Sequence, residues 1–392
     1  MNGRRILIGI VMLGVVHNAL RVIASILGAQ WGYFNYLNGP RNPVPLDFAR
    51  GMEIFGVVAV VGLLILFMRA LWRRAVGPSS AMWSSSIWAL LAAIPLGLLA
   101  VMVSTSADKT YGWMLFVITP FLMGMVATLA LANQRPITLG DALVVSLLSV
   151  LLLGGVLMAL AVEGVICLGM AVPIALIPAI IGGAVGYAIS GKKKNHGAVT
   201  ALLIIGIAPF GGTIESALQP GAELFAVSTS IEIAAPPQRV WQTVLQPAKL
   251  AMPADLMFRA GVAYPLASHI EGAGPSATRY CDFSTGKLVE PVLLWNEPTQ
   301  LRFTVASNPL PMQEWTPYAR IHPPHLEGFL VSRQGEFKLE PLANGGTRLV
   351  ATTWYQHHLW PSRYWQLWSD HIIHSVHRIV LQNVSDRALA YK

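Results

Sequence analysis

Long stretches of hydrophobic residues fill the first 220 positions of the chain, with few charged residues between them. A membrane-spanning helix needs about 20 consecutive apolar residues. We expect seven membrane-spanning helices, at 6–27, 52–72, 86–104, 112–132, 142–162, 165–190 and 197–217. The span at 197–217 is the weakest candidate, because Pro209 interrupts it and Glu215 follows its apolar stretch.

The pattern changes near residue 221. From Val227 to Ala234 polar and apolar residues alternate, which is typical of a strand, and a short helix is expected over 238–245 after two prolines. A long helix is expected over 362–389. Between these helices, turn residues separate six further strand candidates, at 267–272, 277–284, 287–296, 300–306, 326–340 and 346–356.

This order of elements predicts two domains. Residues 1–220 are expected to form a polytopic, all-α membrane bundle. Residues 221–392 are expected to form an α+β domain, in which a curved antiparallel sheet surrounds the long C-terminal helix.

Composition supports the membrane interpretation. Hydrophobic residues make up 54% of the chain and charged residues 12%, whereas a soluble protein has about 25% charged residues. A single soluble enzyme is therefore excluded. The net charge of +8 divides into +7 for residues 1–220 and +1 for residues 221–392. Because the excess lies in the apolar half, it indicates membrane topology rather than nucleic-acid binding.

The basic residues also predict an orientation, because lysine and arginine gather in cytoplasmic loops. If all seven segments cross, the N-terminus is cytoplasmic and residues 221–392 lie outside the cytoplasm of a multi-pass inner-membrane protein. If the segment 197–217 does not cross, the domain lies inside. On one predicted side are Arg4, Arg5, Arg73, Arg74, Arg135 and Lys192 to Lys194, and on the other are Arg41, Arg50 and Lys109.

The second half resembles a known family in four segments. The segments are "SIEIAAPPQRVWQTVL" (230–245), "YCDFSTGKLVEPVLLWNEPTQLRFTV" (280–305), "GEFKLEPLANGGTRLVATTWYQ" (335–356) and "YWQLWSDHIIHSVHRIVL" (364–381). They are similar to the SRPBCC superfamily, which includes START-like, Bet v 1-like and polyketide cyclase/dehydrase and lipid-transport domains. The resemblance implies a helix-grip fold with a cavity for lipids or other apolar ligands. It implies no universal catalytic residue.

Aromatic residues are the first candidates for such a cavity, because their large apolar area suits a ligand pocket and equally an ordinary core. On the last helix, a polar stripe that includes His374 and His377 lies at the edge of a broad apolar face. This face comprises Trp365, Trp368, Ile372, Val376, Ile379 and Val380. The expected ligand-binding residues are Trp295, Trp315, Tyr318, Trp354, Trp368, His374 and His377.

Two polar groups suggest alternatives. Asp370, His374 and His377 have i, i+4, i+7 spacing and carry zinc-ligand side chains. A solvated or headgroup-facing stripe is the simpler explanation, and a polar patch at the cavity mouth is a third. His325 and Glu327 follow two prolines and are weak candidates for acid–base catalysis. No cofactor is expected.

The function expected from these observations is membrane-anchored binding, transfer or sensing of a lipid or other apolar small molecule. The expected partner is therefore a membrane lipid or apolar molecule, and nucleic acid is not expected. One alternative is a cyclase or hydrolase that acts on an apolar substrate in the same cavity. Another is a transporter or sensor in which a ligand acts on the helices.

Overall fold

The structure is a computed structural model that describes residues 80–102, 104, 111–191, 223–316, 321, 323–328 and 330–390. The chain divides into two compact units, each with its own hydrophobic core. A helical unit comprises Met1–Gln219 together with Glu314–Pro324, and a C-terminal unit comprises Pro220–Gln313 and His325–Lys392.

The helical unit contains three helices that are long and apolar enough to cross a membrane: Met114–Ala132, Leu139–Ala159 and Val165–Ser190. They correspond to the predicted spans 112–132, 142–162 and 165–190. The span predicted at 86–104 falls on α4, whose apolar part, Ser85–Val101, is shorter. The described elements are α4 (Ser80–Met102), η2 (Met114–Ile118), α5 (Thr119–Ala132), α6 (Leu139–Ala159) and α7 (Val165–Ser190).

Four of the seven predicted spans fall in the described part of the chain. Three of these four are long and apolar enough to cross a membrane. The other three predicted spans, at 6–27, 52–72 and 197–217, lie outside the described residues.

Glycines allow α5 and α7 to pack closely. A Cβ atom on Gly182 would lie 1.9 Å from the backbone oxygen of Phe121, and one on Gly124 would lie 2.2 Å from the backbone oxygen of Ala179. Both distances are impossible for real Cβ atoms, so any larger residue must separate the two helices. Small residues at helix interfaces are typical of membrane helices.

Glu314 belongs to the helical unit, although it follows most of the C-terminal strands in the chain, and it caps α7. The Glu314 carboxylate accepts hydrogen bonds from the backbone N–H groups of Ile166 and Cys167, each at 3.1 Å. Gly164 precedes the helix, and a Cβ atom there would lie 2.1 Å from Glu314 Oε2. A carboxylate at a helix N-terminus satisfies free N–H groups and complements the helix dipole. The change of pattern near residue 221 does not predict that Glu314 belongs to the helical unit.

The C-terminal unit is built on one sheet of eight strands, in which all neighbours are antiparallel and the order is β1-β8-β7-β6-β5-β4-β3-β2. The predicted strand ranges agree with the structure, except that the strand predicted at 326–340 begins later. The strands are β1 (Leu224–Ile233), β2 (Ala248–Lys249), β3 (Pro265–Glu271), β4 (Thr278–Phe283), β5 (Gly286–Asn296), β6 (Gln300–Thr304), β7 (Leu330–Pro341) and β8 (Thr347–His357).

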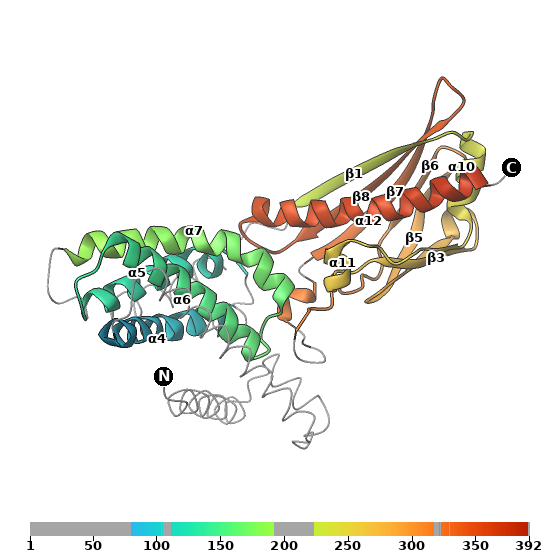
Figure 1. The fold of residues 1–392 in the computed structure, drawn as a ribbon. Coiled ribbons are helices and arrows are strands. Elements are labelled where there is room, and N and C mark those ends of the chain that lie inside the picture. The colour runs from blue at the N-terminus through green and yellow to red at the C-terminus, as the bar shows by residue number, and fades with distance from the viewer. Residues whose placement is uncertain are drawn as a thin grey trace, which may run out of the picture. The chain divides into compact units, whose positions relative to one another are not determined.

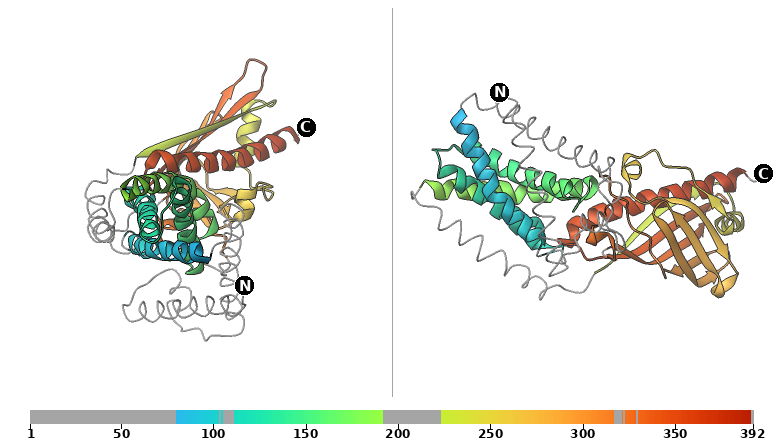
Figure 2. Two further views of the ribbon diagram at one scale, coloured as in Figure 1. Left: turned by 60° about the vertical axis from the view of Figure 1, so that its left-hand side comes forward. Right: turned by 90° about the horizontal axis from the view of Figure 1, so that it is seen from below.

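The long helix α12 (Ser362–Ala390) lies along the concave face of this sheet (Figures 1 and 2). The sheet and helix enclose a core that includes Trp241, Leu301, Leu349 and Leu381, each no more than 1% exposed. This is the helix-grip arrangement. The remaining elements are α10 (Pro237–Leu245), α11 (Leu256–Ala260), η3 (Gly274–Ser276) and η4 (Pro324–Leu326).

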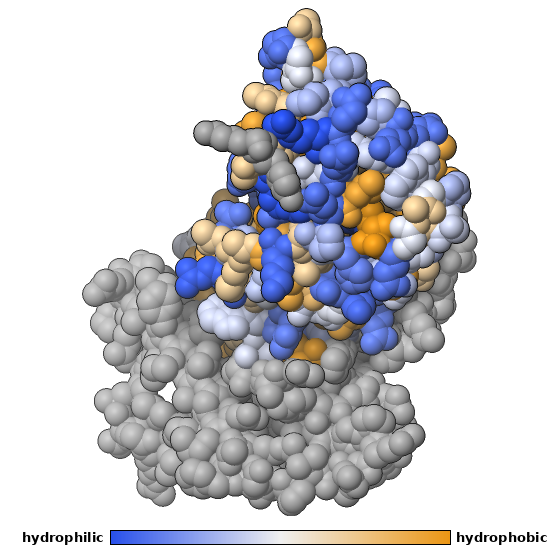
Figure 3. Space-filling view, turned by 90° about the vertical axis from the view of Figure 1, so that its right-hand side faces the viewer, coloured by the Kyte–Doolittle hydropathy of each residue, from blue (hydrophilic) through white to orange (hydrophobic). Residues whose placement is uncertain are grey.

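Hydrophilic side chains dominate the face of the C-terminal unit seen in Figure 3. Apolar side chains gather there only in smaller areas.

Candidate functional site

A cavity of about 160 Å³ lies inside the C-terminal unit, between the concave face of the sheet and α12. Most of its wall is apolar. The strands contribute Phe283, Leu288, Phe303 and Phe337, and the helix contributes residues on one face: Ile372, Ile373, Val376 and Val380. The helix residues Ile372, Val376 and Val380 belong to the apolar face predicted from the sequence.

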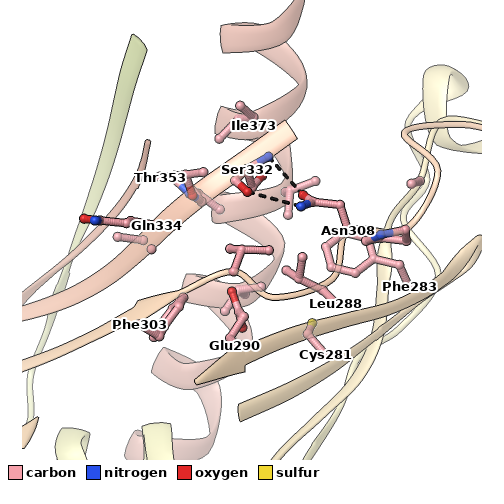
Figure 4. Close-up of a pocket in the computed structure, with 18 of the residues that line it drawn as sticks. Cys281, Phe283, Leu288, Glu290, Phe303, Asn308, Ser332, Gln334, Thr353 and Ile373 are labelled. Carbon is pink, nitrogen blue, oxygen red and sulfur yellow. Dashed lines mark hydrogen bonds between the residues drawn. The ribbon is translucent and has the colours of Figure 1, made fainter. Parts of the chain in front are cut away.

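Strand alternation explains which residues reach the cavity. On β4, Arg279, Cys281 and Phe283 share one face, and on β5, Leu288 and Glu290 share one face, because successive side chains point to opposite sides. The antiparallel register places Arg279 directly opposite Glu290 and Cys281 directly opposite Leu288. Two charged residues therefore occupy positions in an otherwise apolar row. Figure 4 shows one of them, Glu290, with Cys281 and Leu288.

Arg279 and Glu290 form a buried ion pair at the cavity wall. The side chains are 8% and 5% exposed, and Arg279 Nη1 donates a hydrogen bond to Glu290 Oε2. The guanidinium carbon also lies 5.3 Å from the ring centre of Phe303 and 5.5 Å from that of Phe337. Such contacts between a cation and an aromatic face are attractive, so the cation is held by one carboxylate and two rings.

Burial and pairing act in opposite directions on this pair. Burial raises the pKa of Glu290, and the neighbouring Arg279 only partly offsets this effect. Burial acts to lower the pKa of Arg279, but the Glu290 carboxylate outweighs it and raises that pKa. A guanidinium does not deprotonate in proteins, so the site keeps a positive charge with an adjacent carboxylate.

Cys281 lies beside the pair and is 2% exposed. Burial raises the pKa of its thiol to about 11, against the opposing effect of Arg279. The thiol is therefore protonated at neutral pH. Since the thiolate is the nucleophilic form and the side chain is buried, Cys281 reacts with a thiol reagent slowly, when the domain opens.

Asn308 fixes the loop that closes one side of the cavity. Its side-chain oxygen accepts a hydrogen bond from Ser332 N at 2.9 Å, and its side-chain nitrogen donates to Ser332 O at 3.2 Å (Figure 4). These bonds occur at a bulge between Ser332 and Gln334, where β7 shifts register against β8. The Asn308 amide thus replaces the backbone partner of a neighbouring strand.

The polar stripe of α12 meets threonines of two strands. His377 Nε2 lies 2.8 Å from Thr353 Oγ1, and His377 Nδ1 lies 3.0 Å from Thr229 Oγ1. His374 Nδ1 lies 2.7 Å from the same Thr229 oxygen. One hydroxyl has a single proton, so Thr229 donates to one imidazole and accepts from the other. The four side chains form one continuous chain of hydrogen bonds.

His377 and Thr353 also line the cavity. Burial lowers the pKa of His377 to about 4, with a smaller effect from His374. The imidazole is therefore neutral at pH 7 and can accept a proton or a hydrogen bond. Of the expected ligand-binding residues that the structure describes, His377 is the one that lines this cavity.

Asp370 lies on the same stripe but has other partners. It accepts hydrogen bonds from the Tyr355 hydroxyl at 2.5 Å and from Gln366 Nε2 at 3.2 Å. The weak alternative of a metal site at Asp370, His374 and His377 would need these groups to exchange their partners for an ion. Burial, with a further contribution from Asp370, raises the pKa of Tyr355.

The predicted tryptophans lie elsewhere. Trp295 packs edge to face on the fully buried Trp241, with ring centres 5.6 Å apart. Trp354 contacts the guanidinium of Arg302, 5.3 Å from its ring centre. Trp368 is half-buried on α12. None of the three lines the cavity.

The other predicted residues belong to the segment before β7. Trp315 is 65% exposed, and its backbone oxygen accepts a hydrogen bond from Val165 N at 2.9 Å. His325 is buried in η4, and Glu327 is exposed in the bend that follows. Tyr318 lies outside the described residues. Neither His325 nor Glu327 lines the cavity.

The sequence interpretation did not select Arg279 or Glu290. For Arg279 a signal was present, because it shares the apolar phase of its predicted strand with Cys281 and Phe283. A charged residue in that phase points into the domain, where it needs a partner. For Glu290 strand phase alone gives no signal, because apolar residues occupy both phases of 287–296.

The sequence matches no family model and no curated protein. Similar solved structures include a truncated norcoclaurine synthase from Thalictrum flavum, at 11% identity over 44% of this chain and 99% of that chain, with a TM-score of 0.30. Ara h 8.0201 is 13% identical over 43% of this chain and 99% of its own, with a TM-score of 0.27. A Thermus thermophilus protein is 15% identical over 42% and 98%, with a TM-score of 0.23. The helix-grip description rests on the sheet and helix themselves.

Proposed function

We propose that the C-terminal unit binds an apolar small molecule in the cavity between α12 and the sheet. The observation that supports this is a mostly apolar cavity with a few convergent polar groups, which is the usual composition of a ligand site. Burial of apolar ligand surface would supply the binding energy, at about 25 cal/mol per Å².

The size of the cavity restricts the ligand. Pockets for drug-sized molecules measure about 300–1,000 Å³, whereas this one measures about 160 Å³. An apolar cavity of about 150 Å³ holds benzene. In its present form the cavity suits a compact molecule or a short part of a longer lipid.

We further propose that the chain is an integral protein of the bacterial inner membrane and belongs to the SRPBCC superfamily. Its helices of membrane-spanning length support the first part, and the helix-grip fold together with the sequence resemblance supports the second. The ligand would then enter from the adjacent membrane. With seven spans the domain lies outside the cytoplasm, so a C-terminal alkaline phosphatase fusion should be active in bacteria, and an inactive fusion would contradict this location.

A catalytic role is the second candidate, and the Thr353–His377 hydrogen bond favours it. A hydroxyl bonded to a neutral imidazole, itself oriented by a second hydroxyl, is the arrangement used for base-assisted chemistry. Here Thr353 and His377 both face the cavity, and Thr229 holds the far side of the imidazole. His377 would act as the base on a bound substrate.

The binding function is tested by purifying the full chain in detergent and identifying by mass spectrometry the small molecules that accompany it. An apolar molecule is expected at about one equivalent. The control is a chain in which Ile373 and Val376 of the cavity wall are both replaced by Phe, which fills the space. Equal recovery from both chains would show that the molecule does not occupy the cavity. A chemically altered molecule that accompanies the parent chain, but not a chain in which His377 is replaced, would instead favour the catalytic role.

A further inference from the structure

Burying the ion pair in the cavity wall has a free-energy cost, and a functional role would explain why the pair is present. Removing two charges from water costs several kcal/mol per ion, and a buried pair is often no more stabilising than well-packed apolar residues. The C-terminal unit nevertheless places Arg279 and Glu290 opposite each other in a wall of aromatic and aliphatic side chains. A ligand that uses both groups would account for this arrangement.

Both members of the pair retain unused hydrogen-bonding capacity. A guanidinium has five N–H donors in a fixed plane, and a carboxylate has about four acceptor positions. Within the described residues, the hydrogen bond to Glu290 uses Nη1 of Arg279, and Glu290 accepts only from Arg279. The free N–H donors of Arg279 and the free acceptor positions of Glu290 therefore lie side by side at the cavity wall.

The charges around the cavity cancel. Arg279 is balanced by Glu290, and the other lining carboxylate, Glu336, is balanced by Arg302, whose Nη2 lies 2.6 Å from it. The remaining titratable lining groups, Cys281 and His377, are neutral at pH 7 for the reasons given above. An anionic ligand would therefore bring an unbalanced charge into a poorly solvated site, which is strongly unfavourable.

We infer, on the basis of the proposed ligand-binding function, that the cavity selects an apolar alcohol or phenol and discriminates against carboxylates. The hydroxyl oxygen accepts a hydrogen bond from Arg279, and the hydroxyl proton is donated to Glu290. An alcohol or phenol satisfies both members of the pair and adds no charge. A ketone satisfies only Arg279, and a hydrocarbon satisfies neither.

The test compares three aromatic probes of similar size: 4-ethylphenol, benzoate and ethylbenzene. The full chain is used in detergent with Cys167→Ala, so that Cys281, inside the cavity, is the single thiol. Binding is measured as slower reaction of Cys281 with a thiol reagent. At pH 7 the phenol should protect Cys281 at least tenfold more effectively than the benzoate, with ethylbenzene between them.

Two variants identify the ion pair as the cause. Glu290→Gln removes the balancing charge and should shift the preference at least tenfold toward benzoate. Arg279→Met with Glu290→Met removes both charges and should reduce the phenol to the level of ethylbenzene; it remains informative if the single variant does not fold. Glu232→Gln is the matched control, because Glu232 forms an exposed cross-strand pair with Arg348 at 2.8 Å on the same sheet.

The outcomes separate the inference from the function on which it rests. Protection by the phenol that disappears in the double variant supports the inference. Equal or stronger protection by the benzoate in the parent chain, or an unchanged phenol preference in the double variant, overturns it while leaving apolar binding intact. Failure of all three probes, ethylbenzene included, overturns the binding function itself.

Discussion

Arg279 on β4 and Glu290 on β5 are direct cross-strand neighbours whose side chains meet inside the curved sheet. Because both are almost completely buried, each depends on the other more than an exposed pair would. Single and double substitutions of this pair should therefore differ in their effect on the free energy of unfolding.

Replacing Arg279 or Glu290 alone by Met should destabilise the C-terminal unit by about 3–5 kcal/mol, because the remaining charge is left unpaired. Replacing both should cost much less or stabilise the unit. The measurement is protection of Cys281 against a thiol reagent in denaturant, in the Cys167→Ala background. The exposed pair Glu232 and Arg348 is the control, and its single substitutions should change stability by less than about 1 kcal/mol. Equal cost for the buried single and double variants would contradict the pairing.

Acid should weaken the C-terminal unit through His377. Its pKa is about 4 in the folded domain and about 6.5 when unfolded. Between these values the unfolded chain binds more protons, so stability is present above pH 6.5 and is lost as the pH falls toward 4. The difference corresponds to about 3 kcal/mol.

In the variant His377→Asn, the stability of the C-terminal unit should depend less steeply on pH between 6.5 and 4. Stability is measured with a disulfide reagent that reacts with Cys281 at acid pH. Some slope should remain, because burial also lowers the pKa of His357. Glu290 acts in the opposite direction, since burial raises its pKa. The comparison is therefore between the variant and the parent chain, and identical profiles would exclude His377 as the main source.

Regular patterns in the sequence predicted most of the C-terminal fold. Alternation and turn residues located the strands, and the apolar face of the last helix included Ile372, Val376 and Val380, which line the cavity. The span at 86–104 was less well predicted, because hydropathy alone does not define where a helix ends. The capping of α7 by Glu314 joins residues 147 or more positions apart, for which local pattern contains no signal.

The site was harder to predict than the fold. Large aromatic side chains suggested the cavity wall, but Trp295 packs on Trp241 and Trp354 contacts Arg302. Strand phase would have been a better guide than residue type. It separates Trp354 from the inward-facing Thr353, and it identifies Arg279 as an inward-facing charge that needs a partner.

The tryptophans offer a direct comparison of core and surface. Trp241 is fully buried, so Trp241→Ala should destabilise the C-terminal unit by about 3–5 kcal/mol. Trp354→Ala should cost clearly less, because its ring is only partly buried, and it should not alter ligand protection of Cys281. Both effects are measured by thiol protection with and without 4-ethylphenol. A loss of protection in Trp354→Ala at unchanged stability would place Trp354 in the ligand site after all.

The last prediction concerns the helical unit and the contact between α5 and α7. Gly182→Ala places a Cβ atom 1.9 Å from the backbone oxygen of Phe121, so the helices must move apart at a cost of about 1–3 kcal/mol or more. Gly169→Ala on the same helix is the matched control, because no atom lies within 4 Å of its added Cβ. Thermal exposure of Cys167 in a Cys281→Ala background should occur at a lower temperature for Gly182→Ala and not for Gly169→Ala. In the Cys167→Ala background, Gly182→Ala should leave the protection of Cys281 unchanged if the two units fold separately. A loss of this protection would show that the units unfold together.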